Sequence, residues 1–314
     1  MTITPFRTSP VPRYENPVIS EPWPGVPDPT VLQVEDTYYL YATTGGRPEA
    51  FSQYSSKDLV NWKPEGYMFK PEDKPAWISG DYWAPDVQQV EDGYIAYYTA
   101  RDQDGRLCIG VGTSHSPTGP WIDSGKPLVH DTRVGMIDPN CFVDEDGKKY
   151  LYWKGDHNDL RPQESTPIYV QELSASGLEL VGERREVLHN TLPWEGDLVE
   201  GTCTVRHDDQ YFMFYSGNAF WNDRYATGVA RSDSPLGPFE KKGDPILRSG
   251  QLFAGPGHGT VATAPDGENY YLYHAWETGK TGDPHSRNLL MDKITWGEDG
   301  WPSIAQGTPS GAVP

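Results

Sequence analysis

The stretch DPNCFVDEDGKKYLYWKG (Asp138–Gly155) consists of an apolar run, an Asp/Gly-rich turn and an aromatic run. The same kind of unit occurs four more times, and the five starting positions are separated by 56, 54, 62 and 58 residues. A period of this length indicates a repeat architecture. The other copies are DPTVLQVEDTYYLYATT from Asp28, APDVQQVEDGYIAYYTA from Ala84, EGTCTVRHDDQYFMFYSG from Glu200 and HGTVATAPDGENYYLYHAW from His258.

Each unit predicts a β-hairpin, because two β-type runs are joined by a short Asp/Gly-rich turn. A second strand pair follows, and its turn is marked by segments such as SSKDLVNW (Ser55–Trp62), SHSPTGPW (Ser114–Trp121) and SDSPLGPF (Ser232–Phe239). We therefore predict an all-β, five-bladed β-propeller with four-stranded antiparallel blades around a central channel. A β-sandwich would not show this repeat. We expect residues 1–314 to form a single catalytic domain without a C-terminal β-sandwich.

The formal net charge of −19 argues against partners with an anionic surface. Nucleic acids and anionic membranes attract basic patches, and the chain has no run rich in Lys or Arg. An uncharged sugar would not be repelled. The N-terminus lacks the apolar segment of a secretory signal, and no window approaches the ~20 apolar residues of a membrane span, so we expect a cytoplasmic protein. Its oligomeric state is left open.

The first position of the aligned unit carries acids or an imidazole in four of the five copies. In a propeller the innermost strands line one channel, so these positions should converge near the axis. Like charges gathered at a partly desolvated site push at least one pKa upward. Paired carboxyl groups suit glycoside hydrolysis, in which one protonates the leaving oxygen and the other activates water. The candidates are Asp28, Asp138, Glu200 and His258.

The sequence resembles glycoside hydrolase family 43 at these residues. The pieces that carry the resemblance are PDPTV (Pro27–Val31), WAPDV (Trp83–Val87), IDPNCFVDEDGKKYLYW (Ile137–Trp153), VEG (Val199–Gly201) and GPGHGTV (Gly255–Val261). The resemblance covers nearly all of residues 15 to 302 and implies a five-bladed, inverting enzyme. One departure is EGT at Glu200–Thr202, where many β-xylosidase-like members have EGP.

The resemblance also implies roles for individual residues. Asp28 would be the general base, Glu200 the general acid, and Asp138 the residue that raises the pKa of the acid and positions it. Arg287 would reach toward the substrate and Asp138. Trp83 resembles the aromatic residue that flanks the sugar in the innermost subsite.

Further candidates are a channel ion and a second aromatic wall. His258 resembles a histidine that contacts a hydrated Ca²⁺ or Na⁺, and because Ca²⁺ prefers oxygen ligands, waters would have to complete its shell. Such an ion would act electrostatically or structurally, and no organic cofactor is expected. Phe220 and Trp221 lie in the aromatic and polar segment GNAFWNDRY, which is typical of a subsite wall.

The sequence thus predicts an exo-acting glycosidase that releases terminal L-arabinofuranose, D-xylose or both from arabinan, arabinoxylan or xylo-oligosaccharides. Three alternatives stay open. An endo-1,5-α-L-arabinanase would use the same acids in an open cleft. A retaining, fructan-type propeller would use Asp28 as nucleophile, although its expected RDP motif is absent. A non-catalytic sugar-binding propeller would explain the aromatic residues without requiring three repeated acids.

Overall fold

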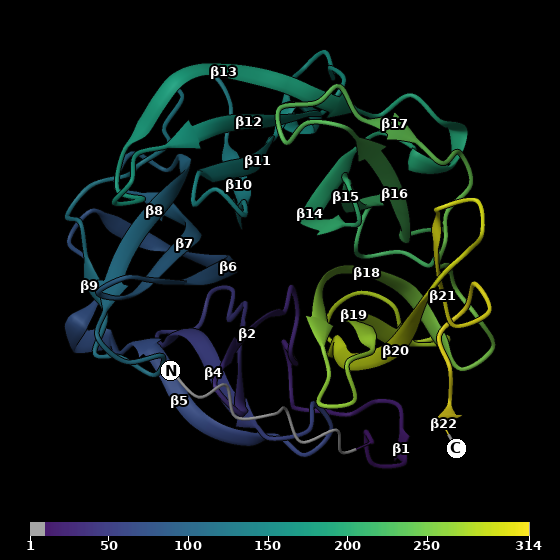
Figure 1. Cartoon of the computed structure of the whole chain (residues 1–314). Coiled ribbons are helices and arrows are strands. Elements are labelled where there is room, and N and C mark those ends of the chain that lie inside the picture. The colour runs from purple at the N-terminus through teal and green to yellow at the C-terminus, as the bar shows by residue number, and fades with distance from the viewer. Residues whose placement is uncertain (1–9, 314) are drawn as a thin grey trace.

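Five four-stranded antiparallel sheets form a ring around a central axis in the computed structural model, which describes residues 10–313 (Figure 1). Within each sheet the strands follow one another in chain order from the axis outward. The predicted all-β, five-bladed propeller is therefore confirmed. That the whole chain is one domain without a β-sandwich stays a prediction, and residues 1–9 and 314 lie outside the described residues.

The strands of the blades are best grouped by their distance from the axis. The innermost are β2 (Thr30–Val34), β6 (Ile78–Val90), β10 (Met136–Val143), β14 (Val199–His207) and β18 (Phe253–Thr263). The second are β3 (Thr37–Ala42), β7 (Gly93–Asp102), β11 (Lys149–Gly155), β15 (Gln210–Gly217) and β19 (Asn269–Glu277). The third are β4 (Ala50–Ser56), β8 (Leu107–Ser114), β12 (Pro167–Leu173), β16 (Ala226–Ser232) and β20 (Asn288–Trp296). The outermost are β5 (Lys63–Phe69), β9 (Ile122–Asp123), β13 (Leu180–His189), β17 (Glu240–Lys241) and β21 (Pro302–Ile304).

Short elements complete the described chain. Two-residue strands β1 (Tyr14–Glu15) and β22 (Ala312–Val313) pair antiparallel with each other. Three short 3₁₀ helices lie between strands: η1 (Pro71–Asp73), η2 (His157–Asp159) and η3 (Pro193–Glu195). Among residues 10–313 there is no helix of the length and apolarity that a membrane crossing requires.

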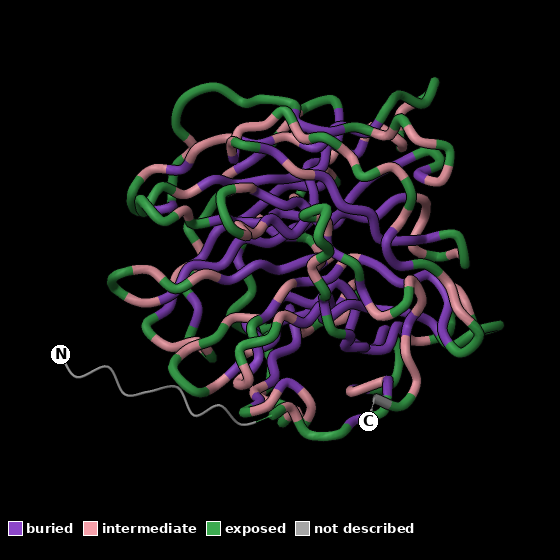
Figure 2. The backbone as a smooth tube through the Cα atoms, turned by 45° about the vertical axis from the view of Figure 1, so that its right-hand side comes forward, coloured by how far each residue is buried: buried purple, intermediate pink, exposed green. Residues whose placement is uncertain are grey.

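The second strand of a blade is buried on both faces because its side chains alternate between two neighbouring cores. In β11, Tyr150 and Tyr152 pack toward blade four, whereas Leu151 and Trp153 pack toward blade two. The unbroken aromatic run in the sequence is therefore explained by burial from both sides. Figure 2 shows that buried stretches run through the interior and that exposed ones lie mostly in the connecting loops.

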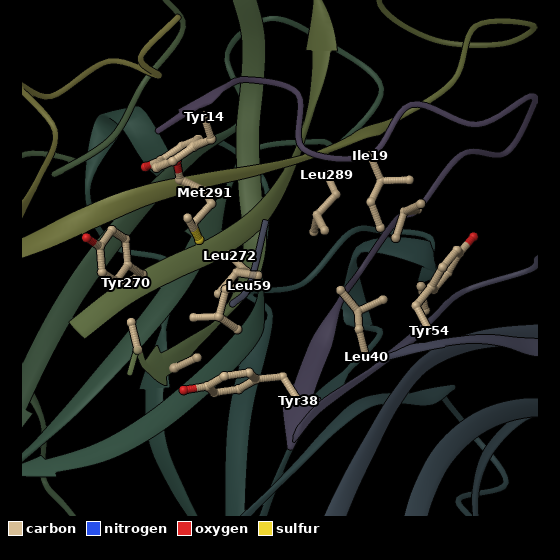
Figure 3. Close-up of a cluster of buried hydrophobic side chains, with 14 residues drawn as sticks. Tyr14, Ile19, Tyr38, Leu40, Tyr54, Leu59, Tyr270, Leu272, Leu289 and Met291 are labelled. Atoms are coloured by element: carbon tan, nitrogen blue, oxygen red, sulfur yellow. The ribbon is translucent and has the colours of Figure 1, made fainter. Parts of the chain in front are cut away.

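The ring closes where blade five packs against blade one. Tyr38 and Leu40 of β3 share a buried cluster with Leu272 of β19 and Met291 of β20 (Figure 3). The segment before β2 covers this cluster, and the hydroxyl of Tyr14 donates a hydrogen bond to the carbonyl of Met291 at 3.0 Å. The ring is therefore closed by apolar packing, and the polar groups at the edge of the cluster are hydrogen-bonded. This closure fixes the start of β2 relative to β18.

Candidate active site

The backbone turns sharply at the start of each inner strand. At the repeated position φ is positive in all five blades, a region that side chains other than glycine rarely occupy. The φ values are +52° at Asp28, +44° at Ala84, +57° at Asp138, +59° at Gly201 and +43° at His258. The turn directs this part of each blade toward the axis, where the five blades meet.

The alignment of the fourth repeat needs a correction of one residue. We aligned Glu200 with Asp28 and Asp138, but the position with positive φ in blade four is Gly201. The strand register agrees, because Cys203 pairs with Phe214 as Asn140 pairs with Tyr152. A Cβ atom at Gly201 would approach the ring of His258 to 2.6 Å, so only glycine fits there. Glu200 therefore reaches the axis from the residue before the turn.

All eight residues proposed from the sequence line one cavity of about 280 Å³ at the axis. The cavity lies near the lower end of the sizes found for small-molecule sites, which suits a substrate of one or two sugar rings. It is lined by Asp28, Trp83, Asp138, Glu200, Phe220, Trp221, His258 and Arg287, together with Thr43, Ile137, Lys154, Asp156, Asn158, Asp159 and Leu198.

Asp28 is held as a carboxylate. Its Oδ1 lies 2.8 Å from Nη1 of Arg287 and 3.3 Å from Nδ1 of His258, and its Oδ2 accepts a hydrogen bond from Thr43 at 2.7 Å. Burial alone would raise the pKa of Asp28, but the charges of Arg287 and His258 outweigh burial and hold this pKa well below its usual range. Asp28 is thus charged across the neutral range.

His274 is a neutral partner of Asp28. Burial and the charge of Arg287 lower the pKa of His274 to about 4. Its Nδ1 can therefore accept the backbone N–H of Asp28, 3.2 Å away, and does not form an ion pair with the carboxylate. The ring stacks on Tyr225 with centroids 5.7 Å apart. His274 thus fixes the backbone at Asp28.

Asp138 has the opposite electrostatic setting. Burial and the nearby Glu200 carboxyl raise the pKa of Asp138 to about 7, against the opposing charges of His258 and Lys154. Its Oδ2 lies 4.0 Å from Nδ1 of His258 and accepts the backbone N–H of Gly201 at 3.3 Å. Asp138 is therefore the carboxyl group that holds a proton near neutral pH.

Glu200 lies between two buried donors. Lys154 Nζ is 2.8 Å from Oε2 of Glu200, and the hydroxyl of Tyr225 donates to Oε1 at 3.0 Å. Lys154 also lies 2.9 Å from Oδ1 of Asp156, and its side chain is only 2% exposed. Burial would lower the pKa of Lys154, but Glu200 and Asp156 more than compensate and hold it above its usual value. The ammonium group is thus charged at the site.

Sequence reasoning missed Lys154, although the repeat contains a signal for it. The equivalent position near the end of the second strand reads Thr43, Thr99, Lys154, Ser216 and His274. It lies two residues past Tyr41, Tyr97, Tyr152, Phe214 and Leu272, each of which pairs with the inner strand of its blade. In four blades this side chain accepts the backbone N–H of the next blade in the ring, at Ala84, Asp138, His258 and Asp28 respectively. A lysine has no acceptor. Blade three therefore breaks the pattern, and Asp138 accepts the N–H of Gly201 in its place.

Three aromatic side chains, Trp83, Phe220 and Trp221, contribute to the cavity wall. The guanidinium of Arg287 lies over the ring of Phe220, 4.5 Å from its centroid, so one residue contacts both Asp28 and the wall. Trp221 packs edge-on against Phe220 with centroids 5.1 Å apart and is 57% exposed. Trp83 of β6 is partly exposed at the same cavity. Arg287 contacts Asp28, whereas the resemblance had placed it toward Asp138.

His258 fits an ion only if that ion keeps most of its water shell. Its Nδ1 faces Asp28 and Asp138, which leaves one ring nitrogen for a ligand. Ca²⁺ takes six to eight oxygen ligands, and Asp28 already serves Arg287 and Thr43. The predicted Ca²⁺ or Na⁺ therefore stays a prediction, in which His258 supplies one contact and water supplies the remainder.

The arrangement as a whole can perform acid–base chemistry on a neutral substrate. It offers a charged carboxylate at Asp28, a carboxyl group with raised pKa at Asp138, and a third acid, Glu200, that is held by two donors. Groups with pKa values driven apart by their surroundings are the pattern expected of an acid and base pair. Aromatic side chains share the lining of this cavity with the charged groups, as in sites that bind a polar ring.

Several known proteins are similar to this chain over most of its length. The β-D-galactofuranosidase xynD of Aspergillus niger is 28% identical over 87% of this chain and 80% of xynD. The extracellular exo-α-(1→5)-L-arabinofuranosidase ArbA of Cellvibrio japonicus is 26% identical over 89% of this chain and 86% of ArbA. The crystal structure of a thermostable family-43 glycoside hydrolase superposes with a TM-score of 0.85 at 32% identity, covering 95% of this chain and 98% of that one.

These relatives correct the expected location. ArbA is described as extracellular, and so is endo-α-(1→5)-L-arabinanase 1 of Bacillus subtilis, which is 24% identical over 88% of this chain and 86% of the relative. The prediction of a cytoplasmic protein was therefore wrong. It rested on the lack of an apolar segment at the N-terminus, and secretory signals are removed from mature proteins, so that lack does not reveal the compartment.

The model of glycosyl hydrolases family 43 matches residues 14–302, which span all five blades. The match runs from β1 to the start of β21 and contains all fifteen residues that line the cavity. It agrees with the fold, with the cavity at the axis that is lined by Asp28, Asp138 and Glu200, and with the similar proteins. The chain belongs to glycosyl hydrolase family 43 and is a glycoside hydrolase.

Proposed function

We propose that this enzyme is an inverting, exo-acting glycosidase that releases terminal L-arabinofuranose, D-xylose or both from oligosaccharides of arabinan, arabinoxylan and xylan. The observation that carries the proposal is a group of buried carboxyl groups around one cavity of about 280 Å³, among which Asp28, Asp138 and Glu200 each have a different electrostatic setting. Arabinofuranosidase activity in a relative with matching coverage supports the choice of sugar.

Asp28 is the proposed general base. Because Arg287 and His258 hold its pKa low, it is charged when a water molecule arrives and can accept the proton of that water. A general base contributes typically 10²–10⁴-fold to the rate. Arg287 would hold the carboxylate and, through its contact with Phe220, keep that wall in place.

Glu200 is the proposed general acid. Asp138 and Lys154 are proposed to set the pH range over which a proton is available for donation. Asp138, with its raised pKa, keeps a proton at the pair near neutral pH. In this proposal the proton held at Asp138 moves to Glu200, which passes it to the leaving oxygen and becomes a carboxylate again. Lys154 and Tyr225 are already placed to stabilise that carboxylate, so they favour the form that appears as the proton leaves. Lys154 is thus a positioning residue that makes proton donation easier.

Exo action is supported by the small size and the walls of the cavity. Phe220 and Trp221, and Asn158 and Asp159 of η2, are among the residues that line it. An endo-arabinanase would lower the viscosity of linear arabinan rapidly, whereas an exo enzyme releases monosaccharide with little early change in viscosity. A sugar-binding propeller would release none. Aryl α-L-arabinofuranoside, β-D-xyloside and β-D-galactofuranoside assayed side by side identify the sugar.

The role of Glu200 is tested by Glu200→Gln on two substrates. The variant should lose most of its activity on a natural linkage, whose leaving group needs a proton, and much less on an aryl glycoside with an acidic phenol. Glu145→Gln serves as control, because Glu145 is an exposed carboxyl on blade three that pairs with Arg206 outside the cavity. Equal losses on both substrates would show that Glu200 is not the acid.

The proposed ion is tested by chelation and readdition. If a hydrated Ca²⁺ or Na⁺ lies beside His258, it would supply positive charge under the bound sugar. If the ion is Ca²⁺, activity lost on chelation should return when Ca²⁺ is added. If it is Na⁺, activity should depend on the Na⁺ concentration. The activity of His258→Ala should respond to neither ion. An unchanged rate in both treatments would remove the ion from the proposal.

A further inference from the structure

Three side chains with metal-binding atoms meet on blade two, away from the carboxyl groups of the cavity. Asp102 ends β7, Cys108 lies in β8, and His130 follows the bridge between Ile109 and Val129. Their ligand atoms all lie within 4.8 Å of one another. Within residues 10–313 this is the one such group of three or more.

We propose that Asp102, Cys108 and His130 form a structural zinc site, with water as the fourth ligand. A thiolate, an imidazole and a carboxylate together suit Zn²⁺, whereas Ca²⁺ and Mg²⁺ take oxygen ligands. The site is separate from the ion proposed beside His258, which is hard and hydrated.

The distances between the ligand atoms fit a tetrahedral zinc ion after small movements. With zinc bonds of about 2.3 Å to sulfur and about 2.0 Å to nitrogen and oxygen, tetrahedral angles separate sulfur from oxygen by about 3.5 Å and nitrogen from oxygen by about 3.3 Å. The observed separation is 3.7 Å from Cys108 Sγ to Asp102 Oδ2 and 3.9 Å from His130 Nε2 to the same oxygen. Contractions of this size need side-chain motion only.

The carboxyl group of Asp102 is already oriented for the site. Its Oδ1 accepts the backbone N–H groups of Asp104 at 3.0 Å and Arg106 at 2.8 Å. These bonds fix Oδ1 in the β7–β8 turn and direct Oδ2 toward Cys108 and His130. Hydrogen bonds that orient a ligand in this way typically change metal affinity 10–100-fold.

The thiol and the open side of the site also match a zinc centre. Zinc binds the thiolate form of cysteine, so binding at Cys108 would release the thiol proton to solvent. Asp102 and His130 border an open cavity of about 450 Å³, which gives the ion and its water a path of entry. The side chain of His130 is 39% exposed and can adjust.

Zinc here would link the β7–β8 turn to the segment that leads into Asp138. His130 lies eight residues before Asp138. Between them, Gly135 passes so close to Leu107 and Asp156 that a Cβ atom there would approach their Cβ atoms to 3.1 and 3.4 Å. A zinc bond to His130 would therefore restrain the segment that leads into β10. The restraint would act without contact between the metal and the substrate.

The test measures zinc binding by the whole chain, independent of activity. After chelation and buffer exchange, the protein is titrated with Zn²⁺ against a chromophoric indicator, and its Tm is recorded with and without the metal. We expect one zinc per chain and a rise in Tm. His130→Ala and Cys108→Ser should each weaken binding at least about 100-fold, which exceeds the cost of losing an orienting partner.

Matched controls keep the test informative. His115→Ala removes an exposed histidine of the same blade, and Cys141→Ser removes a buried thiol outside the site, so both should bind zinc as the unchanged protein does. Co²⁺ should give a thiolate-to-metal absorption band that Cys108→Ser lacks. No stoichiometric zinc, or binding that survives both His130→Ala and Cys108→Ser, would overturn the proposal.

Discussion

Replacing Lys154 by methionine probes the proposed acid most sharply, because methionine keeps an unbranched side chain of similar length and removes the ammonium group. In the structure Nζ lies 2.8 Å from Glu200 and 2.9 Å from Asp156, and all three side chains are at most 10% exposed. The change leaves two buried carboxyl groups without their cation. We expect effects on both stability and the pH dependence of the rate.

The magnitude follows from the burial. Removing one partner of a buried ion pair costs about 3–5 kcal/mol, because the remaining charge is left uncompensated. The charge of Lys154 also lowers the pKa of Asp138. Loss of that charge should raise the pKa of Asp138 further, so that Asp138 and Glu200 together keep their proton to higher pH.

The assay combines urea unfolding with the pH profile of kcat/KM on an aryl glycoside. Lys154→Met should be less stable at neutral pH, and the basic limb of its profile should move to higher pH while its maximum falls. Lys148→Met is the matched control, since Lys148 pairs with Asp146 at the exposed turn of the same blade and should change neither readout. Lys154→Arg should recover part of both. A profile that superposes on the unchanged enzyme would refute the role of Lys154.

Two further changes test the base. Asp28→Asn should lower turnover of natural and aryl substrates alike, by about 10²–10⁴-fold, because both need an activated water. A loss confined to natural substrates would point to a different role. Arg287→Met should raise the pKa of Asp28, since Arg287 holds it low, and because the base works only above its pKa, the acidic limb of kcat/KM should move to higher pH. An acidic limb that stays in place would show that Arg287 does not control Asp28.

The fold was predictable because the five sequence repeats correspond to the five blades. Each hairpin has its own turn signal, and the alternating burial of Tyr150, Leu151, Tyr152 and Trp153 in β11 accounts for an aromatic run that would otherwise be ambiguous. Convergence of the three acids followed from the pseudo-symmetry alone. The details at the axis did not follow, because the backbone turn at Gly201 displaces Glu200 by one residue from the position of Asp28.

Lys154 and His274 were not identified as site residues from the sequence for a related physical reason. They lie at the end of the second strand, and the sequence alone does not show that this position reaches the next blade. Once the hydrogen bonds of Thr43, Thr99 and Ser216 are seen, the lysine becomes an obvious exception. Of the proposed zinc ligands, Asp102 and Cys108 belong to one hairpin, whereas His130 lies 22 residues after Cys108 and is brought to them by the bridge at Val129.

The anomer that forms first on hydrolysis tests the central claim most directly. If Asp28 activates water on one face of the sugar while Glu200 protonates the leaving oxygen on the other, a single displacement inverts the anomeric centre. Proton NMR during early turnover of an aryl α-L-arabinofuranoside or β-D-xyloside should therefore show the inverted sugar first, followed by slow mutarotation. Initial appearance of the retained anomer would contradict the assignment of base and acid.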